Sequence, residues 1–99
     1  MSIIHRMTVC ARPGRSIRLG QCLARLHEVG RDIPGCERLR VFPLRNDPLT
    51  WQVEGHWYSA AARDTFLGSE GLRRVVAQAI DEGLFTHLEC GMELQQQVA

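Results

Sequence analysis

The residues best suited to chemistry lie in one short segment, Trp51–Tyr58, with the sequence Trp-Gln-Val-Glu-Gly-His-Trp-Tyr. The segment alternates like a strand, so one face would carry Trp51, Val53, Gly55 and Trp57. Gly55 leaves a gap between the two indoles that no side chain fills. That gap could hold a small, flat, apolar ligand against Trp51 and Trp57. The alternative is that both tryptophans belong to the core and Gly55 lets them pack.

Four polar side chains could move a proton or hold an anion. A neutral imidazole at His5 or His56 could take a proton, and a guanidinium at Arg6 or Arg40 could hold an oxyanion. For each of them the alternative is a salt bridge or an interface hydrogen bond. Glu54 is the only acid within the patterned strand, and we expect it to pair with an arginine at a dimer interface.

A metal site is the lesser interpretation of the histidines. His5, His56 and His87 fall on neighbouring predicted strands, and three imidazoles could leave an open coordination position. No His-x-x-x-His, His-x-His or Cys-x-x-Cys spacing supports such a site, so we expect no metal. We expect the cysteines to be small buried apolar residues rather than a disulfide framework; they are Cys10, Cys22, Cys36 and Cys90.

Composition excludes several classes of function. The 99 residues form one domain, 1–99, of ordinary globular composition, 44% hydrophobic and 23% charged. The net charge of +1 gives no reason to expect nucleic acid or an anionic membrane as a partner. All cations are arginine, which excludes lysine Schiff-base chemistry and a P-loop lysine. Neither a membrane-spanning run nor a signal peptide is present, so we expect a cytoplasmic protein.

The order of predicted elements favours one fold class. Apolar alternation and 3.6-residue periodicity, with Ser59 and Ser69 as helix caps and Gly83 as a helix end, give strand, helix, strand, strand, helix pair, strand. The ranges are 3–11, 16–32, 36–44, 49–58, 60–67, 70–82 and 84–94. This is an α+β chain with the ferredoxin-like β-α-β-β-α-β plait and an antiparallel four-stranded sheet.

The plait leaves one face of its sheet without helices. The predicted strands carry bulky apolar residues on both faces; in the first strand Ile4 and Cys10 alternate with Ile3, Met7 and Val9. Apolar groups on the open face need a second layer, and a second copy of the sheet is the simplest source. We therefore expect a homodimer packed sheet to sheet.

Four short motifs occur in an order that resembles a known family. They are Arg12-Pro13-Gly14 after the first strand, Ile33-Pro34-Gly35-Cys36 before the second, Glu54-Gly55-His56-Trp57-Tyr58-Ser59, and Phe66-Leu67-Gly68-Ser69-Glu70. From about Ile4 to Cys90, their order and spacing resemble the antibiotic biosynthesis monooxygenase-like family. The resemblance implies a dimeric α+β barrel.

The resemblance also implies an activity. Some members oxidise phenol- or quinol-type aromatics with molecular oxygen and without a cofactor, because the substrate anion itself gives an electron to oxygen. A related branch degrades haem with an Asn, a Trp and a His. Here the Trp matches Trp57, while the Asn position falls near Met7 and the His position near Val76. The resemblance therefore implies a cofactor-independent monooxygenase for a small aromatic and argues against haem degradation.

Other positions depart from the family pattern. The frequent family His on the short helix falls at Phe66, and the acid two residues before the Trp falls at Gly55. Glu54 is displaced by one residue, which in a strand turns its side chain to the opposite face. We expect Met7, Phe66 and Val76 to join the substrate-binding wall. The alternatives are a non-catalytic dimeric barrel that binds an apolar ligand or has a structural or sensory role, and an isomerase or decarboxylase on the same scaffold.

Overall fold

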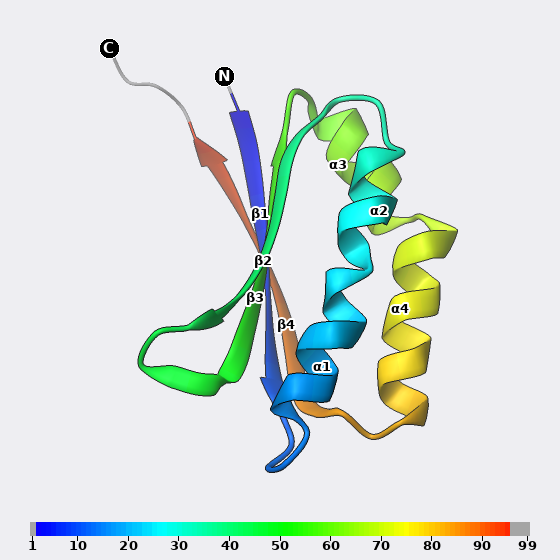
Figure 1. Cartoon of the computed structure of the whole chain (residues 1–99). Coiled ribbons are helices and arrows are strands. Elements are labelled where there is room, and N and C mark those ends of the chain that lie inside the picture. Colours follow the sequence, from blue (N-terminus) through cyan, green and yellow to red (C-terminus); the bar gives the residue numbers. More distant parts are fainter. Residues whose placement is uncertain (1, 96–99) are drawn as a thin grey trace.

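A central antiparallel sheet with helices on one side organises the chain (Figure 1). This computed structural model describes residues 2–95, and side chains only for residues 2–91. The strand order is β2-β3-β1-β4, the order of the ferredoxin-like plait predicted from the sequence. In chain order the elements are β1 (Ser2–Ala11), α1 (Ser16–Ala24), α2 (Leu26–Arg31), β2 (Cys36–Leu44), β3 (Asp47–Trp57), α3 (Ala60–Leu67), α4 (Glu70–Asp81) and β4 (Phe85–Gln95).

The predicted helix over residues 16–32 is divided into α1 and α2. At the division the N–H of Arg25 donates to the carbonyl of Cys22, three residues back, at 3.3 Å. This tight 3₁₀-type turn interrupts the α-helical pattern. The apolar stripe continues across it, because Leu23 and Leu26 are both buried against the sheet.

The ends of α3 and α4 follow the predicted capping residues. Ser59 Oγ accepts the N–H of Ala62 at 3.1 Å, and Ser69 Oγ accepts the N–H of Leu72 at 3.2 Å. Gly83 follows the C-cap of α4 with φ of +63°, a conformation that glycine adopts without strain. These caps fix the short connections that place α3 on the helix side of the sheet, beside the upper ends of β1 and β3 (Figure 1).

Helix-facing positions of the sheet form the core. On β1 these are Ile3, His5, Met7 and Val9. The opposite face of the same strands is more polar than the sequence pattern predicted, since it carries Arg6 on β1 and Glu54 on β3, paired across the strands. The helix-free face is therefore partly an ionic surface.

The expectation of four buried cysteines was wrong for three of them. Cys22 is buried, Cys10 and Cys36 are partly exposed, and Cys90 is exposed; all four are free thiols. Cys10 points to the helix-free face, while Cys36 and Cys90 lie on edge strands that the helices cover poorly. Within residues 2–95, no helix is both long and apolar enough to cross a membrane.

Candidate functional site

A buried aromatic cluster joins β1, β3 and α3. His5, Trp57 and Phe66 each have no exposed surface. Their ring centroids are 5.8 Å apart for His5 and Trp57, 5.5 Å for His5 and Phe66, and 5.0 Å for Trp57 and Phe66. Each ring contacts both others, so the cluster is a closed packing unit between the sheet and α3.

Gly55 permits the contact between the histidine and the indole. The register pairs His5 with Gly55 across β1 and β3. A Cβ at position 55 would lie 2.6 Å from His5 Cε1 and 2.6 Å from Trp57 Nε1, closer than real Cβ contacts come. The gap that the sequence placed beside Trp57 is therefore real, but the imidazole of His5 fills it.

The indole fixes the tautomer of His5. Trp57 Nε1–H donates to His5 Nδ1 at 2.8 Å, so Nδ1 is unprotonated and the neutral ring carries its hydrogen on Nε2. Nε2 is buried and has no hydrogen-bond partner among the described residues. A neutral His5 therefore offers a hydrogen-bond donor at Nε2. As a base it would have to break the bond from Trp57, contrary to the proton-accepting role that the sequence suggested.

Burial keeps His5 neutral. Loss of solvation lowers the pKa of His5 to about 4, and the positive charge of Arg63 contributes to the same shift. Arg63 lies on α3, three residues before Phe66 and thus on a neighbouring part of the helix surface. Its side chain is 19% exposed and pairs with Asp64 at 2.9 Å. The sequence analysis missed Arg63; its i, i+3 spacing from Phe66 was the available signal.

A second polar cluster lies on the helix-free face around Glu54. One carboxylate oxygen accepts from Arg6 Nε at 3.0 Å; the other lies 2.9 Å from His56 Nε2 and 3.7 Å from Arg40 Nη1. Burial favours a higher pKa for Glu54, but hydrogen bonds from His56 and Arg6 outweigh it and leave the pKa below its ordinary value. Glu54 pairs with Arg6 within one chain, and the pairing at a dimer interface stays a prediction.

The four polar candidates do not meet in one site. His5 faces the helices, whereas Arg6, Arg40 and His56 surround Glu54 on the other face. The three strand histidines do not converge either, because His87 is exposed and pairs with Glu89 at 2.8 Å. Among the described residues, no group of three potential metal ligands occurs.

The remaining predicted wall residues are spread over the helix side. Met7 is a buried core residue. Trp51 is half-buried and donates from Nε1 to Ser16 Oγ at 3.0 Å; its ring lies so close to Gly20 that a Cβ there would be 2.4 Å away. The indole of Trp51 thus packs on α1. Val76, on α4, lines a shallow apolar groove of about 330 Å³ at the α3–α4 junction.

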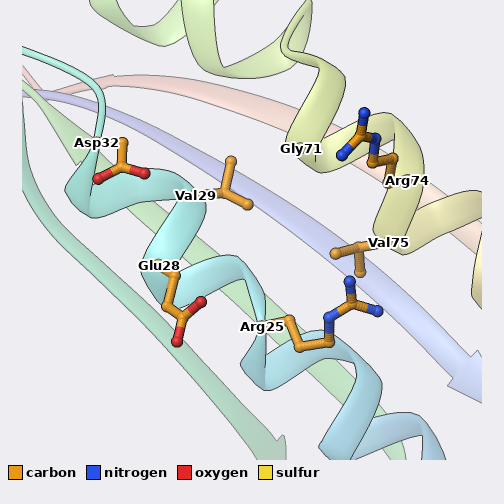
Figure 2. Close-up of a pocket in the computed structure, with 7 residues that line it drawn as sticks. All are labelled: Arg25, Glu28, Val29, Asp32, Gly71, Arg74 and Val75. Carbon is orange, nitrogen blue, oxygen red and sulfur yellow. The ribbon is translucent and has the colours of Figure 1, made fainter.

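The aromatic cluster lies apart from three hollows on the helix side and at the β2 edge. A cavity of about 190 Å³ lies between α2 and α4. Figure 2 shows the residues that line it: Arg25, Glu28, Val29, Asp32, Gly71, Arg74 and Val75. A third hollow, of about 350 Å³, lies between α2 and edge strand β2 and includes Cys36 and Arg38. Neither these two nor the α4 groove is lined by His5 or Trp57, so the cluster is closed in this structure.

Solved structures share this architecture. One is a candidate antibiotic biosynthesis monooxygenase from Deinococcus radiodurans, with a TM-score of 0.86 and 20% identity over 98% of this chain and 95% of that one. A mutant form of SnoaB, a cofactor-independent oxygenase from Streptomyces nogalater, has a TM-score of 0.80 and 16% identity over 98% and 95%. Rv0793 from Mycobacterium tuberculosis has a TM-score of 0.83 and 17% identity over 100% and 99%.

Comparison of the sequence itself gives no match. No protein-family model matches the chain, and no curated protein does. The structural likeness covers almost all of each chain, while sequence identity is so low that the likeness shows the fold alone. The chain therefore has the α+β fold of the solved antibiotic biosynthesis monooxygenases, which confirms at the level of fold the resemblance found in the sequence.

Proposed function

We propose that the chain is a cofactor-independent monooxygenase that oxidises a small phenol- or quinol-type aromatic with molecular oxygen. The observation that carries this proposal is the Nε2–H of His5, a buried donor without a partner among the described residues, inside an aromatic cluster. A phenolic oxygen is an acceptor joined to a flat ring, so it suits both the donor and its surroundings. SnoaB, which has this fold, is named a cofactor-independent oxygenase.

His5 and Arg63 would act by stabilising the substrate anion. A free phenol has a pKa of about 10, so it is mostly protonated near neutral pH. A fixed N–H donor from His5 and the nearby charge of Arg63 favour the phenolate in a site that excludes water. His5 serves here as the donor to the oxyanion, and the phenolic proton passes to bulk water as the substrate enters, before the site closes around the anion. The anion is the electron-rich form that can give an electron to oxygen.

The substrate supplies every electron in this reaction. One molecule of a hydroquinone reacts with one molecule of dioxygen to give one hydroxyquinone and one water. One oxygen atom forms a new C–O bond on the ring, and the other leaves as water with two hydrogens from the substrate. No external reductant is required, and the protein contributes binding, orientation and stabilisation of the anion.

We also propose that two copies pack through their helix-free faces. Arg40 and Phe42 of β2 pair with Glu54 and Gln52 and stack with the guanidinium 4.8 Å from the ring, and Tyr58, directly after β3, is 67% exposed. An exposed tyrosine and a stacked arginine are typical of interface residues. Light scattering at micromolar concentration is expected to give a dimer mass; a monomer would contradict the proposal.

Oxygen uptake tests the activity. Purified protein without added metal or flavin is incubated with a panel of hydroquinones and polyphenols. Turnover is expected to fall at least tenfold, about 1.4 kcal/mol of transition-state stabilisation, in His5→Phe and Trp57→Phe. His87→Ala, an exposed histidine on β4, serves as the control. A loss with His56→Ala but not with His5→Phe would move the site to the helix-free face.

The non-catalytic barrel predicts a different result. The closed cluster is a specific observation in its favour, because Phe66 already fills the space beside His5 and Trp57. Binding of a phenol without oxygen uptake over the whole panel would identify the chain as a ligand-binding barrel and contradict the oxygenase.

A further inference from the structure

The short helix α3 covers the aromatic cluster with the ring of Phe66, which packs on both His5 and Trp57. Of its eight residues only Ala62 and Phe66 are buried. Phe66 places its ring against both His5 and Trp57, and Arg63 brings its charge near the same imidazole. By contrast, α4 buries Leu72, Val75 and Ala79 along an apolar stripe. The cover over the cluster is therefore the more weakly anchored of these two helices.

The two ends of α3 are held differently. At its start the N–H of Tyr58 donates to the carbonyl of Gly35 at 2.9 Å, and Ala62 packs on the same glycine, where a Cβ would lie 2.7 Å from the Ala62 Cβ. At its end the Gly68 N–H donates back to the Asp64 carbonyl at 3.0 Å, and the Phe66 carbonyl accepts from the N–H and the hydroxyl of Ser69, the N-cap of α4, at 3.0 and 2.7 Å. The first turn of α3 is held by the segment that leads into β2, while the turn that carries Phe66 is held by the short connection to α4.

Resting on the proposed function, we propose that α3 is a lid over the His5–Trp57 pair. When it opens, a planar phenol takes the place of the Phe66 ring. The phenol's oxygen then accepts the Nε2–H of His5, which has no acceptor among the described residues while the lid is closed. The exchange replaces one ring by another of the same size and gives a buried donor its partner. Phe66 thereby decides access to the site and the size of the ring admitted.

Exchange of the Trp57 indole hydrogen with solvent tests the lid. That N–H is buried and bonded to His5, so it exchanges only when the cluster opens. Ser59→Ala removes the cap of α3 and should speed exchange about fivefold, the effect of losing a typical cap. Ser16→Ala removes the contacts of a serine at the start of α1, to the Pro48 carbonyl and the Trp51 indole, and should leave this exchange unchanged. Equal acceleration by both variants would show global unfolding, and no acceleration by Ser59→Ala would show another route; either result contradicts the lid.

Removing the Phe66 ring tests the binding mode. Phe66→Ala should create a benzene-sized space beside His5, so phenol should shift the Trp57 indole N–H resonance at concentrations at least tenfold below those needed with wild type. Thr65→Ala, an exposed change on the same helix, is the control and should bind phenol like wild type. Toluene should bind Phe66→Ala at least threefold more weakly than phenol, because it has no acceptor for His5. Equal binding of toluene and phenol, or no binding of either, would contradict the proposed pose.

These measurements separate the lid from the oxygenase. Neither needs oxygen or turnover. Normal phenol binding and lid opening without oxygen uptake would contradict the proposed function and leave the lid. Oxygen uptake with unchanged indole exchange in Ser59→Ala would contradict the lid and leave the oxygenase.

Discussion

The two faces of the sheet hold their histidines in opposite ways. His5, on the helix side, accepts from an indole, has no exposed surface and is kept neutral by burial. His56, on the other face, lies against the carboxylate of Glu54 beside two arginines. The first is a single donor in an apolar site; the second belongs to an ion network. One strand pair thus separates a site suited to anion stabilisation from a surface suited to partner contacts or solubility.

The largest expected effect comes from Trp57→Ala on the helix side. It removes a fully buried side chain and the hydrogen bond to His5, so the free energy of unfolding should fall by about 3–5 kcal/mol. Unfolding by denaturant measures this loss of free energy. Tyr58→Ala, the exposed neighbour, should change it by less than about 0.5 kcal/mol. Equal losses in the two variants would show that the faces do not differ in packing as described.

The next largest effect is expected in the pH dependence of the unfolding free energy, which should depend on His5. The pKa of His5 falls from 6.5 in the unfolded chain to about 4 in the folded one. Between these values the unfolded chain binds the extra proton, so stability is full above pH 6.5 and is lost as pH falls toward 4, by about 3 kcal/mol. His5→Phe should flatten the unfolding free energy over this range, whereas His87→Ala should keep the slope. An unchanged slope in His5→Phe would show that His5 is not the group responsible.

Gly55→Ala probes the close approach that builds the helix-side cluster. The added Cβ must push His5 and Trp57 apart, with an expected loss of about 1–3 kcal/mol and a shifted Trp57 indole N–H resonance. Gly91→Ala, whose Cβ would meet its nearest atom at 3.9 Å, is the control strand glycine. If both variants are equally stable and the resonance does not move, the described packing at Gly55 is wrong.

The smallest effects are expected on the helix-free face. Glu54→Gln removes the negative charge that lies against Arg6, His56 and Arg40. The free energy of unfolding at pH 7 should fall by about 1–2 kcal/mol. Because the pKa of Glu54 lies below 4.5, this difference should persist down to about pH 4.5 and shrink at lower pH. Arg40→Ala removes a long, half-exposed ion pair and should cost no more than about 0.5 kcal/mol. A loss from Arg40→Ala as large as that from Glu54→Gln would mean that the face is buried by a partner.

Much of the fold was readable from local sequence. The short-range signals are a serine before each of α3 and α4, a glycine after α4 and the alternation around Trp57. The structure contains the helices and the strand that these signals predicted. The position of Gly55 and Trp57 on the same face of β3 also followed from strand parity. The break at Arg25 was missed, because 3₁₀ geometry there interrupts an otherwise continuous apolar stripe.

The site was decided by tertiary structure. Ile3 and Ile4 are both apolar, so the sequence of β1 could not tell which face His5 would take. The register between β1 and β3 set His5 beside Gly55 and Trp57 and sent His56 to the other face. The packing of α3 then brought Phe66 and Arg63 to the same imidazole. Periodicity along a chain is local, whereas strand register and helix docking depend on contacts between residues far apart in sequence, which no local pattern specifies.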